Sequence, residues 1–465
     1  MFVPRAGWVK PESETRLSDV VSLGLVTRVF PPGLVDEVVA ECGRRELRRR
    51  SLPARVVVYF VIGLALFAAE SYEEVFAQLV NGLSWVSRWR EKYVLPSSSG
   101  LFQARVRLGA EPLRMLFRRV AVPLASLSTP GAWLAGRRLV SIDGTTFDVP
   151  DSDENDAFFG RPGTAKGERS AFPQARLVGL VECGTHAIID AELGPYSTSE
   201  VDLARALVSH LTPGMLCVAD RGFYGFKLWA AAAATGADLL WRMRASQRLD
   251  PLEILPDGSY LAKIYDNASY RRVGEGLTVR VVDYQLTGRD GAESYTLITT
   301  ILDQQALSAQ QLALAYRQRW EIENTLDELK THQRGPRVVL RSKSPELVQQ
   351  EIWGHLCCHY AIRTLMFDTA DHNVTDPDQV SFITALRIMR RSIRQPTTDT
   401  PQGRNQLWRA AQDQLIALIN PRRRLRVNPH VIKRKYVKWH VKRAKHRTNT
   451  RPAQRPLPFI LRPLT

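Results

Sequence analysis

Residues 315–330 read AYRQRWEIENTLDELK and predict one long helix. Steps of three or four residues place Tyr316, Arg319, Glu323 and Lys330 on one face of that helix. The face is polar, since it presents a phenol, a guanidinium, a carboxylate and an ammonium in a row. Most charged helix faces are simply solvated. The alternative is that Glu323 completes a metal site and that its neighbours on the face hold DNA phosphates.

The charge of the whole chain favours a polyanionic partner. The 465 residues carry a formal net charge of +17 with a pI near 9.9, which is typical of proteins that bind nucleic acids. Residues 401–465 hold 17 of the 64 lysines and arginines but only one of the 47 acidic residues. Nearly all of the excess charge therefore lies in this tail, which predicts a dedicated nucleic-acid arm.

The cysteines and the apolar segments predict an intracellular protein with no membrane partner. Five cysteines show no regular spacing and no secretory signal is found, a pattern typical of reduced proteins. The apolar residues 56–69 are too few to span a bilayer, which takes about 20 residues, and they predict a buried helix instead. We expect a cytoplasmic protein associated with DNA or the nucleoid.

The pattern of predicted helices and strands changes along the chain, which indicates several domains. Residues 1–130 are expected to form a helical, DNA-binding N-terminal domain. Residues 131–370 alternate strands and helices, which predicts an α/β (α+β) fold with helices packed on a mixed sheet. Within them, residues 245–305 show alternating strands between turn signals and predict an all-β insertion. Residues 371–465 are expected to be helical and then a basic C-terminal tail.

Two aspartates follow apolar, β-rich runs. Asp143 ends one predicted strand and Asp220 ends another, and a glycine follows each within two residues. Carboxylates at strand ends lie at the edge of a sheet where α/β folds bind ligands. Together with Glu323 these aspartates would give three converging carboxylates, a set of ligands that suits Mg²⁺ or Mn²⁺. A site of this kind with two metal ions is suited to phosphodiester chemistry. Taken alone, either aspartate could equally be a turn or cap residue.

The polar helix resembles the YREK signature of DDE transposases from one large group of bacterial insertion sequences. Tyr316, Arg319, Glu323 and Lys330 match all four signature positions at the signature's spacings.

Other parts of the chain resemble the same group. The sequence IDGTT at residues 142–146 is similar to its first-aspartate motif, and ADRGFY at residues 219–224 is similar to its second. The β insertion and the N-terminal helical region also look like this group, so the likeness runs from about residue 17 to about residue 370.

The resemblance implies a retroviral-integrase-like, RNase H-like catalytic core. In that fold the first and fourth strands are neighbours, which would bring Asp143 next to Asp220, and the polar helix would deliver Glu323. The implied cofactors are two divalent ions, Mg²⁺ or Mn²⁺, held by these three residues. The implied reaction is cut-and-paste transposition: water cleaves at the transposon end, and the freed 3′-OH attacks target DNA.

The resemblance also implies partners and further binding residues. The partners are double-stranded DNA, as terminal inverted repeats and as target, and a second copy of the chain in a homodimeric synaptic complex. Tyr316, Arg319 and Lys330 would bind phosphates near the scissile bond, Arg through its bidentate fork and Lys as a point charge. A role of Tyr316 as a recombinase nucleophile is the alternative.

Two further segments are candidate DNA contacts. Gln103, Arg105 and Arg107 lie near a predicted helix start, as in a recognition helix, or belong to an ordinary surface helix. The tail interleaves cations with aromatic residues, which suits phosphate binding with stacking, or is a basic solvated segment until DNA orders it. Its candidate contacts are Lys433, Arg434, Lys435, Lys442 and Arg443.

Several alternatives are open at this point. A metal-dependent nuclease without strand transfer, or a non-catalytic DNA-binding relative, would share much of this sequence, although the second should have lost a member of the acidic triad. His355 and His359 could hold Zn²⁺, but their apolar neighbours favour a packed helix. Some transposases of this group stack a tryptophan of the insertion on a flipped base. Residues 245–305 contain no tryptophan, and Trp241 is expected in the core.

Overall fold

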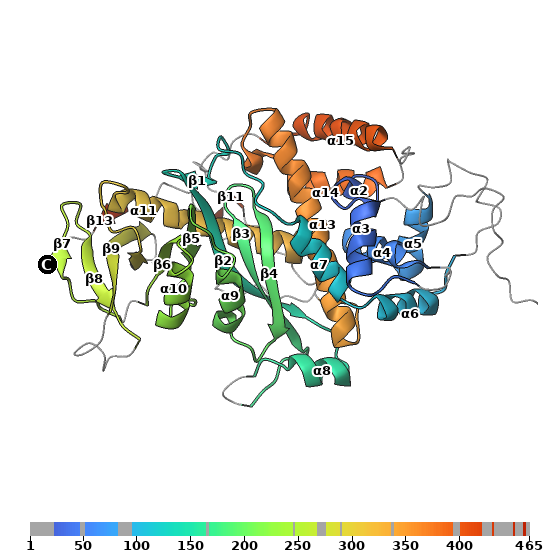
Figure 1. Ribbon diagram of the computed structural model, residues 1–465, viewed down its shortest axis with the longest axis horizontal. Coiled ribbons are helices and arrows are strands. Elements are labelled where there is room, and N and C mark those ends of the chain that lie inside the picture. Colours follow the sequence, from blue (N-terminus) through green and yellow to red (C-terminus); the bar gives the residue numbers. More distant parts are fainter. Residues whose placement is uncertain are drawn as a thin grey trace, which may run out of the picture.

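The computed structural model describes residues 23–46, 52–81, 95–163, 167–244, 247–266, 276–288, 291–335, 339–393 and 400–420, and three short strands within residues 430–461. Helices gather at one end of the molecule, and a long mixed sheet with covering helices makes up the other (Figure 1). None of the helices within these ranges is long and apolar enough to cross a membrane.

The N-terminal part consists of helices, as the sequence predicts, and proline or glycine lies in most of the connections between them. They are α2 (Val26–Val29), α3 (Pro32–Glu41), α4 (Ala54–Leu66), α5 (Tyr72–Asn81), α6 (Ser98–Leu108) and α7 (Glu111–Val120). Ser97 caps α6, because its hydroxyl accepts the backbone N–H of Gly100 at 3.2 Å. All residues of α4 except Arg55 are buried, so this is the buried helix predicted from the apolar run.

The central sheet follows the strand order β4-β3-β2-β5-β6. Its strands are β2 (Arg137–Asp148), β3 (Gln174–Glu182), β4 (Ala187–Pro195), β5 (Met215–Ala219) and β6 (Asp238–Arg242), and the two-residue β1 (Trp133–Leu134) pairs with β2. β2, β3 and β4 are antiparallel neighbours, whereas β5 and β6 run parallel to β2. The first and fourth strands of the core, β2 and β5, are therefore side by side, which confirms the predicted RNase H-like mixed sheet.

The connecting helices cover this sheet. They are α8 (Asp153–Phe159), α9 (Glu200–Val208) and α10 (Phe226–Ala233). α9 packs on β3 and β4 and contacts α10. Trp229 of α10 meets Trp241 of β6 edge-on with ring centroids 5.2 Å apart, and both rings are buried, so Trp241 is the core residue that was expected.

The β insertion continues the central sheet and is not a separate layer. It contains β7 (Glu253–Ile254), β8 (Tyr260–Ile264), β9 (Leu277–Gly288) and β10 (Gly291–Thr299). Because β10 pairs antiparallel with β6, the sheet runs on through β10, β9, β8 and β7. The C-terminal strand β13 (Phe459–Leu461) returns to pair with β9, and β11 (His430–Val431) pairs with β12 (Thr450–Arg451).

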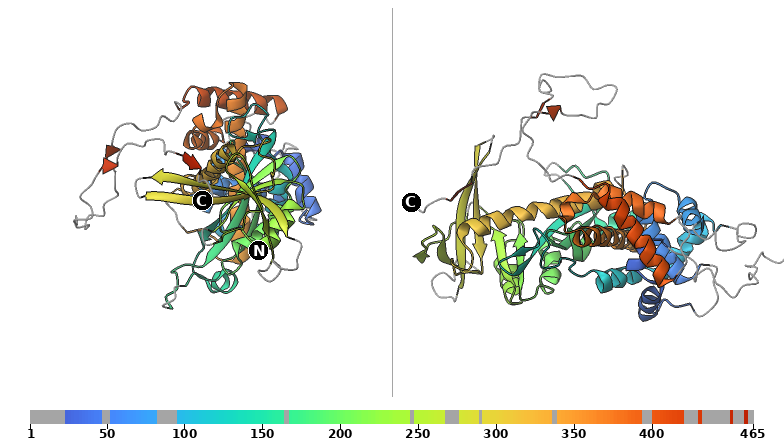
Figure 2. Two further views of the ribbon diagram at one scale, coloured as in Figure 1. Left: turned by 90° about the vertical axis from the view of Figure 1, so that its left-hand side faces the viewer. Right: turned by 90° about the horizontal axis from the view of Figure 1, so that it is seen from above.

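The polar helix is an uninterrupted helical run, as predicted, but its hydrogen-bonding pattern changes along four segments. The run consists of α11 (Ala309–Tyr316), the 3₁₀ turn η3 (Arg317–Arg319), α12 (Trp320–Asp327) and the π-helical η4 (Glu328–Gln333). It forms one rod from the β insertion toward the centre of the molecule (Figure 2). Departures from α-helical hydrogen bonding often mark functional sites, and here they lie on both sides of Glu323.

The long helix α13 (Pro345–His372) joins the parts of the molecule. It packs against α4 and α7 of the N-terminal helices, against β4, and against α14 (Phe382–Ser392) and α15 (Pro401–Ile416), with the short η5 (Pro377–Gln379) between α13 and α14. One hydrophobic core cluster extends from Leu23 through the sheet to Leu415. The N-terminal helices and the sheet therefore share one core.

Candidate active site

Strand pairing brings the two predicted aspartates together. Ile142 of β2 is the parallel partner of Ala219 in β5, so the next residue of each strand, Asp143 and Asp220, is at the same level of the sheet. β5 ends at Ala219, whereas β2 continues to Asp148. The prediction that Asp143 ends a strand is therefore wrong. What ends there is its pairing with β5, and this leaves an open edge above Ala219.

The surroundings of Asp143 disfavour the ionised form of its carboxylate. Burial raises its pKa to about 6, although the backbone N–H of Gly144 donates to its Oδ1 at 2.8 Å and the Arg319 guanidinium lies nearby. The carboxylates of Glu200 and Glu323 add to the increase in pKa. A cation bound beside this carboxylate is therefore expected to stabilise its ionised form.

Asp220 is held by the tyrosine of the polar helix. The Tyr316 hydroxyl donates to Asp220 Oδ1 at 3.2 Å, and the Tyr316 side chain is 2% exposed. Burial and the Asp220 charge raise the pKa of Tyr316. Tyr316 is thus a core residue whose hydroxyl serves Asp220 and is not presented to solvent, contrary to the predicted phosphate contact. A protonated, buried phenol also does not fit the alternative role of a nucleophile.

An aromatic stack supports Tyr316 from the side of the insertion. The rings of Tyr295 and Tyr316 lie edge to face with centroids 6.4 Å apart. Tyr295 stacks on Tyr284 at 5.0 Å, and the Arg242 guanidinium carbon lies 4.0 Å from the centroid of the Tyr295 ring. Strands β6, β9 and β10 thereby fix the position of the tyrosine that orients Asp220.

Arg319 links the polar helix to β2. Its Nη2 lies 3.1 Å from Glu323 Oε1, and its Nη1 lies 4.0 Å from Asp143 Oδ2. The Arg319 side chain is 9% exposed, whereas that of Glu323 is 44% exposed. Arg319 and Tyr316 therefore connect the polar helix to Asp143 and Asp220, and the role of Asp143, Asp220 and Glu323 as metal ligands stays a prediction.

Lys330 lies farther along, in the π-helical segment. It is partly buried, and burial together with the charge of Arg334 lowers its pKa. The carboxylates of Asp148 and Asp327 act in the opposite direction. Lys330 therefore lies beside the far end of β2, toward Asp148, and a phosphate that it binds would be displaced along β2 from Asp143.

The donor set fits a hard divalent ion by its chemistry, since it consists of carboxylate oxygens at the open edge of a sheet. Among the residues that the structure describes, no three acidic, histidine or cysteine side chains are close enough together to hold a metal ion as they stand. Arg319 lies between two of the three carboxylates. His355 and His359 are buried in α13, which agrees with a packed helix.

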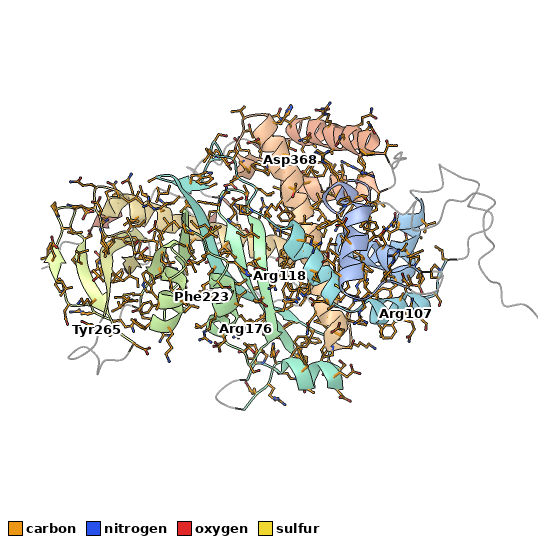
Figure 3. The ribbon with its side chains drawn as sticks, in the orientation of Figure 1. Arg107, Arg118, Arg176, Phe223, Tyr265 and Asp368 are labelled. Carbon is orange, nitrogen blue, oxygen red and sulfur yellow. The ribbon has the colours of Figure 1, made fainter. Side chains whose placement is uncertain are left out.

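The candidate DNA contacts of α6 divide into two kinds. Gln103 and Arg107 are exposed, and Arg107 lies at the end of the molecule away from β7 (Figure 3). Arg105 is fully buried: its Nε donates to Gln350 at 2.8 Å, and its Nη2 donates to Ser342 at 3.0 Å. The prediction that Arg105 contacts DNA is therefore wrong, because its guanidinium is used inside the protein.

The predicted contacts of the tail are outside the described residues. They are Lys433, Arg434, Lys435, Lys442 and Arg443. One residue near the site was not predicted at all. Glu200, the first residue of α9, lies so close to Gly144 that a Cβ added there would be 2.6 Å from Glu200 Oε1. Nothing in the local sequence indicates this approach, because α8, β3 and β4 lie between the two residues in the chain.

Comparison with known proteins found two matching families and a relative that is similar over most of the chain. Residues 20–118 match the family described as insertion element 4 transposase N-terminal, and residues 134–361 match the transposase DDE domain. The transposase InsG for insertion sequence element IS4 of Escherichia coli (strain K12) is 32% identical over 413 residues, which are 88% of this chain and 91% of that protein.

Two more distant similarities were found. The putative transposase InsZ of Escherichia coli (strain K12) is 28% identical over 47% of this chain and 71% of that protein. The cryo-EM structure of the piggyBac transposase synaptic complex with hairpin DNA aligns with 86% of this chain and 85% of its own, at 13% identity and a TM-score of 0.42. The piggyBac likeness is too distant to carry an argument about function.

Proposed function

The chain belongs to the DDE transposases of the insertion element 4 type, and we propose that it cuts DNA at the ends of an insertion sequence and joins the freed 3′-OH to target DNA. The observation that carries this proposal is the pairing of Ile142 with Ala219, because it sets Asp143 beside Asp220. The ion pairs of Arg319 then connect Asp143 to Glu323. We assign Asp143, Asp220 and Glu323 as the catalytic triad.

The reaction needs no covalent intermediate with the protein. In the first step water attacks a phosphorus atom at the end of the element, and the bond to the 3′ oxygen breaks to leave a 3′-OH. In the second step this 3′-OH attacks a phosphodiester of the target and displaces the target's own 3′-OH. One phosphodiester forms for each one broken, so the joining step requires no external energy source.

The three carboxylates would hold two divalent ions, Mg²⁺ or Mn²⁺. These ions would supply the positive charge that activates the attacking oxygen and stabilises the leaving oxygen. The chain's own residues position the carboxylates: the buried Tyr316 hydroxyl orients Asp220, and the Gly144 N–H orients Asp143. Arg319 and Lys330 are the cations of the helical run that are proposed to hold phosphates near the scissile bond.

The remaining proposals concern partners. Double-stranded DNA is proposed as terminal repeats and as target, and joining two ends calls for a second copy of the chain in a synaptic complex. Gln103 and Arg107 on the exposed side of α6 are proposed to contact DNA, as are the cations of the tail. The affinity should fall steeply as salt rises, because phosphate contacts release counterions.

A strand-transfer assay tests the proposal. Duplex DNA taken from the flank of the gene, in one reaction with a pre-cut end and in another with an uncut end, is incubated with target DNA, the full-length protein and Mg²⁺, with a chelator as control. Joined product is the expected result. Cleavage of uncut ends without joining would favour a nuclease, and binding without either activity would favour a non-catalytic relative.

A further inference from the structure

Arg319 holds a position that a cation-binding site would otherwise offer to a metal ion. Its two terminal nitrogens face Asp143 at 4.0 Å and Glu323 at 3.1 Å, and Arg319 interacts electrostatically with Asp220 as well. One guanidinium is therefore the shared counter-ion of all three proposed metal ligands. A divalent ion that takes Asp143 and Glu323 together must approach Arg319 closely, and like charges at that distance repel strongly.

The contacts of Arg319 differ in how easily they can be exchanged. The Glu323 carboxylate is 44% exposed, so water can take the place of the guanidinium as its partner, whereas the Arg319 side chain is 9% exposed and needs another anion when it leaves. The distance to Asp143 is at the limit of an ion pair. By contrast, the hydrogen bond between Tyr316 and Asp220 is largely buried. Arg319 can therefore leave the carboxylates while the framework around Asp220 stays in place.

When DNA is bound, its phosphates offer the Arg319 guanidinium a new partner. Arg319 is the last residue of η3 and the N-cap of α12, so its side chain starts where the 3₁₀ turn passes into the α-helix. A phosphate oxygen pair matches the fork of a guanidinium as well as a carboxylate does. DNA is the anion that the proposed function brings to this edge of the sheet.

We propose that Arg319 is an exchangeable counter-ion, which divalent ions displace from Asp143 and Glu323 and which DNA phosphate then accepts. Metal and DNA consequently bind with positive cooperativity, because each removes the obstacle to the other. Without DNA the carboxylates stay neutralised by Arg319 and bind metal weakly. Such an exchange would keep the metal occupancy of this DNA-cutting enzyme low until its DNA substrate is bound. The inference rests on the proposed function, since it takes the three carboxylates as the metal ligands.

The test measures Mn²⁺ binding to the full-length protein without DNA, by electron paramagnetic resonance of free Mn²⁺. Arg319→Ala should bind Mn²⁺ about three- to tenfold more tightly than the wild type, because the competing cation is gone. The matched control is Arg317→Ala, which removes an exposed cation two residues away and should leave the affinity unchanged. Arg319→Lys keeps a charge, should bind Mn²⁺ like the wild type, and tests the idea if the alanine variant folds poorly.

Adding duplex DNA from the flank of the gene supplies the second readout. DNA should tighten Mn²⁺ binding to the wild type and to Arg317→Ala, and much less to Arg319→Ala. Equal or weaker Mn²⁺ binding by Arg319→Ala, with binding still lost in Glu323→Gln, would overturn the inference and leave the proposed function intact. If Glu323→Gln binds Mn²⁺ as well as the wild type, the metal assignment falls, and the inference falls with it.

Discussion

Glu323 and Glu328 are five residues apart on the same helical run, and each pairs with an arginine, yet their surroundings are opposite. Glu323 is 44% exposed and meets Arg319 at 3.1 Å. Glu328 is largely buried against Arg363, which is 2% exposed, and His359 Nε2 lies 3.6 Å from its Oε2. Burial alone would raise the pKa of Glu328, but Arg363, His359 and His186 outweigh it and lower the pKa to about 2.

This difference in burial makes the Arg319–Glu323 ion pair exchangeable and the Arg363–Glu328 ion pair fixed. Glu328 is committed to α13, and Arg363 also packs over the Phe382 ring at 5.5 Å, so this pair anchors the end of the helical run in the core. Glu323 keeps one side open to solvent. Asp143, across from Glu323, even raises the free energy of the native state at neutral pH, as its raised pKa indicates. The molecule thus fixes the helical run at Glu328 and leaves the carboxylates near Arg319 available to a ligand.

The largest expected effect is on catalysis. Glu323→Gln should reduce metal-dependent cleavage to background, because an amide cannot replace an anionic ligand, while thermal stability and DNA binding stay at the wild-type level. The measurement is cleavage of end-containing duplex DNA in Mg²⁺. Asp327→Asn is the matched control, as its carboxylate is 61% exposed on the next turn of the same helix. Substantial cleavage by Glu323→Gln would remove it from the triad.

The next effect is on stability. Glu328→Gln should lower the free energy of unfolding by about 3–5 kcal/mol, since Arg363 would be left buried without its anion. Adding Arg363→Met to this variant should recover much of the loss. Denaturant titration of both variants measures the difference. A loss below about 1 kcal/mol, as for exposed pairs, would mean that Glu328 is no more fixed than Glu323.

The same acid-to-amide change at Asp143 should raise the free energy of unfolding, whereas the change at Glu328 should lower it. Its folded pKa of about 6 lies above the ordinary aspartate pKa of 3.8, so the ionised carboxylate destabilises the fold above pH 6, and protonation removes this effect as the pH falls toward 4. In metal-free buffer Asp143→Asn should therefore stabilise the protein at pH 7.5 by at most about 3 kcal/mol. Denaturation midpoints as a function of pH measure this, and a gain that stays constant down to pH 4 would contradict the electrostatic origin.

The smallest effect concerns two arginines of α6. Arg107→Ala should weaken DNA binding by about three- to tenfold and reduce its salt dependence by about one unit of slope, because one phosphate contact is lost. Arg105→Ala should instead lower stability and change DNA affinity only through the loss of folded protein. Fluorescence anisotropy at several salt concentrations, with unfolding curves, separates the two. An unchanged salt slope in Arg107→Ala would exclude its contact with phosphate.

Much of the site could be predicted from local sequence. The spacing of Tyr316, Arg319 and Glu323 indicates a shared face, and the apolar runs before Asp143 and Asp220 indicate strands. The structure connects Asp143, Asp220 and Glu323 through Arg319 and Tyr316, and their role as a catalytic triad stays a prediction. The wrong predictions about Arg105 and Tyr316 share a cause, because both concerned what a side chain meets on another element.

Arg105 and Tyr316 illustrate this cause. A helical period places Arg105 on the opposite face of α6 from Gln103 and Arg107, because residues two apart do not face each other, but it cannot say that the partner of Arg105 is Gln350, 245 residues away. The same holds for Tyr316, whose hydroxyl meets Asp220 from 96 residues away. The continuation of β2 beyond Asp143 likewise depends on its pairing with β3, which local propensity does not report.

The sequence by itself determined which chemical groups this protein has and at what spacing: three carboxylates, a basic tail and a polar helix of signature composition. Side-chain identity and helical period are local properties, so they can be read without a fold. Only the tertiary structure decided which of these groups are free to act. Burial and long-range pairing set whether an Arg–Glu pair is exchangeable, as at Glu323, or locked, as at Glu328, because the cost of breaking a pair depends on how far it is removed from water.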